Sequence, residues 1–156
     1  MHSRIFQVST EPIDKADYIK ESDYYDHWFT KSIADYVDDD CYRDEDLKWL
    51  EDCYENEGIK FGVDSNGEYL IIENKEVYFA NSFKRFRKLL DKIKDVTLQD
   101  FVEGIHEMYS LKSAYEDKFG FYMELDGWGL ITMDSFVRGC PENVKYYIGK
   151  SIDYHY

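Results

Sequence analysis

The chain has 156 residues and a formal net charge of −14, from 33 acidic and 19 basic side chains. Hydrophobic residues make up 44% and aromatic residues 18%. This is enough apolar material for a core, which excludes a chain disordered over most of its length. A charge of this sign and size repels nucleic acid and anionic membrane surfaces. We therefore expect a single domain over residues 1–156 whose partner is a basic protein, with direct nucleic-acid binding disfavoured.

The cysteines indicate a reducing compartment. Cys41, Cys53 and Cys140 are odd in number and widely spaced, and no Cys-x-x-Cys pair occurs. This pattern argues against a disulfide framework and a zinc site, and it is typical of free thiols in a cytosolic protein. No apolar run approaches a membrane span, and the N-terminus lacks the apolar core of a secretory signal. We expect a cytoplasmic location, no membrane partner and no cofactor.

The first half of the chain predicts strands and one acidic helix. Residues 4–8 alternate polar and apolar side chains, which favours a strand. Residues 43–57 predict a helix, because apolar side chains recur on one face and acids occupy the first turn, where the helix dipole favours them. A central β-meander is expected next, with strands at 60–63, 68–72 and 77–80.

A helix pair is predicted in the middle of the chain. Residues 82–94 place apolar side chains at helical spacing, with Asn81 or Ser82 as the expected N-cap. A second helix is expected over 97–117, starting at a capping-box pair of Thr97 and Asp100.

The C-terminal part returns to strands. Residues 121–125 and 130–133 flank Asp126-Gly127 and predict a hairpin, and 144–148 and 152–156 are further candidates. The fold class is α+β: an antiparallel sheet of N-terminal strand, central β-meander and C-terminal hairpins, packed against the central helix pair and the acidic helix.

The negative charge is concentrated in an acidic N-terminal subregion, about 1–57. It holds 17 acids and 6 bases, a net of −11, whereas residues 58–156 hold 16 acids and 13 bases, a net of −3. Clustered like charges cost stability unless something uses them. Either this is a solvated face without a partner, or it is an interaction surface. The residues predicted for such a surface are Asp38, Asp39, Asp40, Asp44, Glu45, Asp46, Glu51, Asp52 and Glu55.

The leading hypothesis is an acidic protein-interaction module, with an inhibitor that mimics nucleic acid as its sharper form. Helical carboxylates two to four residues apart approximate the charge spacing of a DNA strand, since a helix rises about 1.5 Å per residue and each strand carries a charge about every 3.4 Å. In size and composition the chain resembles the antirestriction and anti-CRISPR inhibitors of phages and mobile elements. No motif is matched, so the resemblance assigns no residues. A homo-oligomer is also left open.

Residues 84–94 form a basic segment, which contains six Lys and Arg side chains and one acidic residue, Asp91. Arg85, Arg87 and Lys88 could contact phosphate, which makes a nucleic-acid binder one alternative. The net charge and the acids of the following helix oppose that alternative. An internal salt-bridge face toward the acidic subregion is the favoured interpretation.

The sequence predicts no catalytic residue and no metal ligand. Asp64 and Glu73 fit only part of a calcium loop, and Glu103-x-x-His106 occurs once, whereas di-metal bundles need two copies. A small hydrolase or transferase with a pocket at the helix–sheet junction remains the enzymatic alternative. It requires His27 or His106 beside Cys140, a serine or a carboxylate in a cleft.

Overall fold

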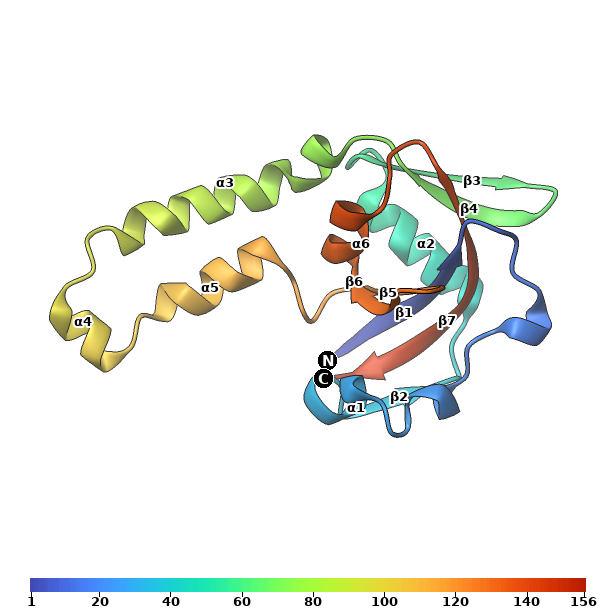
Figure 1. Ribbon diagram of the computed structural model, residues 1–156, viewed down its shortest axis with the longest axis horizontal. Coiled ribbons are helices and arrows are strands. Elements are labelled where there is room, and N and C mark those ends of the chain that lie inside the picture. Colours follow the sequence, from blue (N-terminus) through green and yellow to red (C-terminus); the bar gives the residue numbers. More distant parts are fainter.

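The computed structural model describes residues 1–156 as a mixed α/β protein built on one open seven-stranded sheet (Figure 1). The strand order is β3-β4-β7-β1-β5-β6, and β2 also pairs with β7. β1 and β5 run parallel, so the sheet is mixed and the wholly antiparallel prediction is wrong. A parallel neighbour requires a long crossover, which the chain between β1 and β5 provides. The strands are β1 (His2–Ser9), β2 (Tyr36–Asp38), β3 (Ile59–Asp64), β4 (Gly67–Ile72), β5 (Tyr122–Leu125), β6 (Gly129–Thr132) and β7 (Lys145–His155).

β7 organises the sheet, because it pairs with β1, β2 and β4. The two strands expected at 144–148 and 152–156 are one continuous strand of 11 residues. Gly149 lies at the point where the sequence suggested a break. The register of β1 against β7 shifts between Phe6 and Val8, and a Cβ on Gly149 would lie 2.7 Å from Gln7 Oε1. The glycine therefore makes room for the Gln7 side chain at this irregularity.

Two 3-10 turns and six α-helices complete the fold. They are η1 (Lys15–Asp17), η2 (Glu21–Tyr24), α1 (Trp28–Ser32), α2 (Arg43–Tyr54), α3 (Lys75–Ile93), α4 (Leu98–Glu103), α5 (His106–Tyr115) and α6 (Met133–Gly139). α2 confirms the acidic helix, and Leu50 on its inner face is fully buried. No helix combines the length and apolar character needed to cross a membrane.

The core lies on both faces of the sheet, because successive strand residues point to opposite sides. Ile5 and Phe6 are neighbours in β1, yet they belong to two different apolar clusters. The larger cluster joins the sheet to α2 and α6 through Leu50, Met123 and Phe136, among others. The smaller one joins it to the N-terminal segment through Phe29, Tyr122, Ile152 and Tyr154, among others.

The central β-meander is wrong in its third strand. Residues 77–80 form the first turns of α3, and the N-cap is Asn74 rather than Asn81 or Ser82. The Asn74 side chain accepts a hydrogen bond from the Val77 amide at 3.1 Å. The capping box of Thr97 and Asp100 is confirmed, but the helix predicted over 97–117 is interrupted at Gly104, which has φ of 104°.

α3, α4 and α5 form a long hairpin that extends away from the sheet (Figure 1), and we call residues 75–117 the arm. This differs from the predicted packing of the helix pair against the sheet. Only Tyr78 in α3 and only Ala114 in α5 are buried, and both lie near the root of the arm. The apolar stripes that predicted these helices are therefore only partly covered, where α3 and α5 pack against each other.

Candidate functional site

Most of the predicted acidic residues lie on or next to the outer face of α2. Asp44, Glu45, Asp52 and Glu55 are exposed, with the Asp44 side chain 98% exposed. Asp40 is exposed in the preceding loop, and Glu51 is half-buried on α2. We call these six residues the acidic surface. Among them, only Asp44 forms an ion pair, with the neighbouring Arg43 at 3.9 Å.

Asp46 does not belong to that surface. It is 4% exposed, and its Oδ1 accepts a hydrogen bond from Arg4 Nε at 2.6 Å. Its Oδ2 accepts one from Ser151 Oγ at 2.8 Å. The reason is helical geometry: position 46 lies one turn before the buried Leu50, and residues four apart share a face. Its place in the predicted interaction set is therefore wrong.

Asp38 and Asp39 are only partly available. Asp39 Oδ1 accepts a hydrogen bond from Lys150 Nζ at 2.6 Å, and both residues are half-buried. Asp38 Oδ1 accepts one from the Asp40 amide at 2.8 Å. These two carboxylates contribute to the structure of the β2 segment rather than standing free.

The basic helix does not neutralise the acidic surface. Among the charged residues of the arm, the one ion pair is Lys94 Nζ with Asp91 Oδ1 at 2.6 Å, within the same helix. Arg85, Arg87 and Lys88 are exposed and without an ion-pair partner. The expected internal salt-bridge face is thus wrong, because α3 runs out along the arm instead of folding over α2 (Figure 1).

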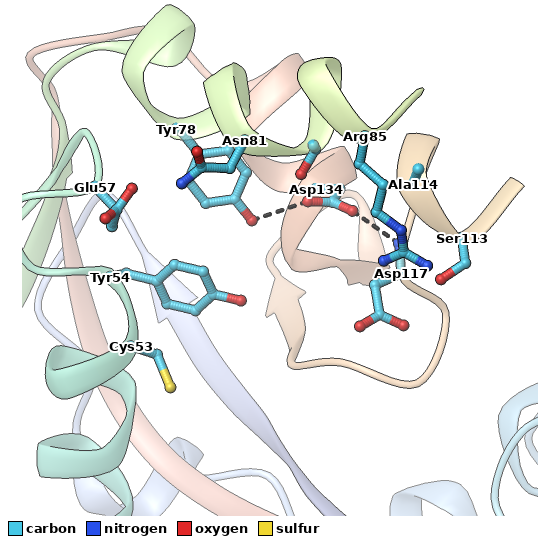
Figure 2. Close-up of a pocket in the computed structure, with 11 residues that line it drawn as sticks. Cys53, Tyr54, Glu57, Tyr78, Asn81, Arg85, Ser113, Ala114, Asp117 and Asp134 are labelled. Carbon is cyan, nitrogen blue, oxygen red and sulfur yellow. Dashed lines mark hydrogen bonds between the residues drawn. The ribbon is translucent and has the colours of Figure 1, made fainter. Parts of the chain in front are cut away.

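A pocket of about 420 Å³ lies where the root of the arm meets the body, between α2, α3, α5 and α6 (Figure 2). Tyr54 and Tyr78 form one wall, with their rings stacked 5.6 Å apart. Burial raises the pKa of both phenols, so both stay protonated at neutral pH. The remaining lining is mostly polar and comprises Cys53, Glu57, Asn81, Ser82, Arg85, Ser113, Ala114, Asp117 and Asp134.

Asp134 is the central carboxyl group of this pocket (Figure 2). Its Oδ1 accepts a hydrogen bond from Tyr78 OH at 2.9 Å, and its Oδ2 accepts one from the Asp117 amide at 2.8 Å. Burial raises its pKa in spite of both bonds. Tyr78 lies at the start of the arm and Asp117 at its end, so Asp134 holds the two ends of the arm to α6.

Arg138, one turn further along α6, reinforces this attachment. Its guanidinium lies over the rings of Phe79 and Tyr115, at 4.6 and 4.1 Å from their centroids. It also donates a hydrogen bond to the Tyr115 carbonyl. Sequence reasoning missed this set of residues, because no local motif reports that α2, α3, α5 and α6 meet here.

The residues of the enzymatic alternative are not brought together. His27 Nδ1 accepts a hydrogen bond from the Phe29 amide at 3.3 Å, and its ring packs edge-on against Tyr24. Burial lowers the pKa of His27. Cys140 is 3% exposed and burial raises its pKa, which disfavours the nucleophilic thiolate. Neither His27 nor His106 hydrogen-bonds a cysteine, a serine or a carboxylate, and the exposed imidazole of His106 has no hydrogen-bond partner.

The partial metal motifs are used for structure. Asp64 Oδ2 accepts a hydrogen bond from Lys145 Nζ at 2.7 Å and lies in the β3–β4 hairpin. Glu103 accepts one from Gln99 at 3.0 Å. No group of three or more His, Cys, Asp or Glu side chains is arranged to hold a metal ion.

No protein-family model matches the chain, and neither a curated protein nor a solved structure matches it. Functional inference therefore rests on the acidic surface, the pocket and the arm themselves.

Proposed function

We propose that this protein is an interaction module that binds a basic protein through the acidic surface. The observation that supports the proposal is the lack of neutralisation: the exposed carboxylates of α2 have no cation partner beyond the adjacent Arg43. The nearest concentration of positive charge in the sequence, residues 84–94, is held on the arm and makes no ion pair with them. Uncompensated like charges are unfavourable for folding, so a binding role gives this arrangement a reason to exist.

The sharper form of the proposal is an inhibitor that mimics nucleic acid and occupies a DNA-binding protein or a nuclease. Exposed carboxylates recur along α2 at 44, 45 and 52 and at its C-cap, Glu55, with Lys48 as the cation between them. A surface built to bind phosphates carries Lys and Arg side chains, which would pair with these carboxylates. Such a complex is steered by charge, so its association rate falls steeply with ionic strength.

The test is affinity capture from a host lysate at low salt, followed by a salt wash and binding measurements with the captured partner. We expect a basic protein that dissociates as salt rises from about 0.05 M to about 0.5 M. Neutralising α2 with Asp44→Asn, Glu45→Gln, Asp52→Asn and Glu55→Gln should abolish capture while the domain stays folded. Asp46 is kept, because it is buried, and its loss would destabilise the fold rather than test the surface.

The matched control removes the same number of exposed carboxylates away from both α2 and the arm, with Glu11→Gln, Asp14→Asn, Asp26→Asn and Asp126→Asn. Both variants change the net charge equally, so only a local role for α2 separates them. Equal loss of binding in both variants, or a complex that survives the salt wash unchanged, would contradict the proposal.

A nucleic-acid binder acting through α3 is a second candidate, favoured by one observation: Arg85, Arg87 and Lys88 are exposed and unpaired. It predicts salt-sensitive retention on single- or double-stranded nucleic acid that is lost on charge reversal of these three residues. The net charge of −14 opposes it, since the rest of the molecule repels phosphate.

A further inference from the structure

The arm leaves an unusual amount of apolar surface uncovered. Leu98, Phe101, Val102 and Tyr109 are 70–82% exposed, and Phe83 is 61% exposed. A groove of about 570 Å³ runs between α3 and α5, lined by Phe86, Met108, Tyr109, Leu111, Lys112 and Tyr115. Two helices form only one layer, and an apolar face on one layer needs a second layer to bury it. Exposed patches of this kind mark interaction sites.

The charge of the arm differs from that of the rest of the protein. Residues 75–117 carry eight basic and eight acidic side chains, so their net charge is zero and the remaining residues carry the whole −14. Most of that charge, −11, lies in residues 1–57, so two copies of this protein repel each other chiefly through that subregion. The neutral arm extends away from it and is a segment on which self-association meets little electrostatic opposition.

The charge within the arm is also divided. Residues 84–94 carry six bases and one acid, a net of +5, and residues 95–117 carry one base and six acids, a net of −5. The two halves form no ion pair with each other inside one copy, since the sole pair is Lys94 with Asp91. Most of these charges therefore remain available for a complementary surface, apart from side chains such as Glu116, which accepts hydrogen bonds from Thr132 and Ser135 at the root of the arm.

We propose that the arm is a self-association surface, on which two copies pack their apolar faces together with α3 of each lying against α4 and α5 of the other. A two-fold contact uses the same patch on both subunits, so the patch must be complementary to itself. The arm meets this requirement twice, because apolar surface meets apolar surface and the +5 half meets the −5 half. An unrelated acidic or basic partner would match only one half.

The available area is sufficient for a stable dimer. Aromatic side chains bury roughly 150–250 Å² each, so Phe83, Phe101, Tyr109 and Tyr115, which are 55–82% exposed, offer on the order of 500 Å². Leu98, Val102 and Met108, at 50–80%, bring the total near the roughly 800 Å² per partner of a standard interface. α3 alone is about 28 Å long. The tip of the arm therefore lies well beyond the screening length, about 8 Å, from the charged body.

The test measures the mass of the full chain by sedimentation and light scattering across about 1 to 100 μM. We expect a concentration-dependent monomer–dimer equilibrium. Met108→Ser with Tyr109→Ser should shift it to monomer, whereas Tyr42→Ser with Val63→Ser, two exposed apolar positions off the arm, should leave it unchanged. Circular dichroism confirms that each variant is folded.

A charge-swap experiment tests whether the partner of the arm is a second copy of this chain. Arg87→Glu with Lys88→Glu makes both halves of the arm negative, and Glu103→Lys with Glu107→Lys makes both positive. Each variant alone should dimerise at least tenfold more weakly than the wild type, and an equimolar mixture should restore a heterodimer. A wild-type chain that stays monomeric throughout, or a mixture that does not recover, overturns the proposal. So does an arm that retains nucleic acid or another protein while the chain remains monomeric. None of these outcomes bears on the proposed function of the acidic surface, because the variants that test that surface leave the arm unchanged.

Discussion

Substitution of Asp46 tests the structure directly. The sequence predicts that Asp46 belongs to the acidic surface, whereas the structure places it in the interior. The carboxylate connects α2 to the sheet, because it accepts hydrogen bonds from Arg4 in β1 and Ser151 in β7. Asp46→Ala removes both bonds. The Arg4 guanidinium then keeps Asp153 and its contact over the Trp49 ring, 5.4 Å away, but loses its most buried partner.

The expected cost follows from the burial of the two partners. Removing one member of a buried ion pair costs about 3–5 kcal/mol. The Asp46 side chain is 5% exposed and that of Arg4 is 19% exposed. Because Arg4 is partly exposed and retains a second carboxylate, we expect a cost at or just below that range, about 2–3 kcal/mol. For a domain of this size each kcal/mol lowers the Tm by about 2–4 °C, which gives a fall of roughly 4–12 °C.

Urea and thermal unfolding followed by circular dichroism measure this loss. Asp52→Ala on the outer face of the same helix is the matched control, and it should change the free energy of unfolding by less than about 0.5 kcal/mol. A double-mutant cycle with Arg4→Ala isolates the pair. If the cycle shows a coupling energy below about 0.5 kcal/mol, or if Asp46→Ala is as harmless as Asp52→Ala, the buried ion pair does not exist in solution.

Three further outcomes are expected. Asn74→Ala should lower the free energy of unfolding by about 1 kcal/mol in urea titrations, because α3 loses the acceptor for its first-turn amide, whereas Asn74→Asp should retain most of it. Burial raises the pKa of Glu124, so its stabilising, protonated state is present below the unfolded pKa and is lost as pH rises through the folded pKa. Glu124→Gln, which keeps an acceptor for Tyr24 OH, should therefore stabilise the protein at neutral pH. In urea titrations it should also reduce the loss of stability that accompanies a rise in pH above the unfolded pKa of this carboxyl group. Arg138→Ala should increase amide hydrogen exchange in α5 while the sheet stays protected, because Tyr115 loses its cation contact, worth about 1 kcal/mol.

Local signals in the sequence predicted local structure well. The capping pair at Thr97 and the alternation of residues 4–8 are both realised, in α4 and β1. The failure at 77–80 shows the limit of such signals. A short apolar run fits a strand or a helix equally by periodicity, and the decision was made by Asn74 as N-cap and by burial of Tyr78 against Tyr54. That second contact joins α3 to α2 and is invisible to any local window.

The mixed sheet and the pocket could not be predicted, because both are formed by residues that lie far apart in the sequence. The strand β5 lies parallel to β1, although more than a hundred residues separate them, and nothing in residues 121–125 indicates that direction. Asp134 likewise became the attachment point of the arm only because α6 packs beneath both of its ends. Sequence reasoning could predict the helix pair, but the apolar stripes that revealed it could not say whether the body or another molecule would cover them.

The number of acidic residues in the sequence does not tell how many of them form an exposed acidic surface in the structure. The count of −11 in residues 1–57 is correct, yet it includes Asp46, which faces inward, and Asp39, which is paired with Lys150. The bases of 84–94 could have cancelled much of the remainder had α3 folded back over α2, and the arm prevents this. One consequence is that the two proposed surfaces do not compete, since one lies on α2 and the other on the arm. A dimer joined through its arms would present two acidic surfaces to one partner, and linked sites bind more tightly than either alone when the geometry lets both engage.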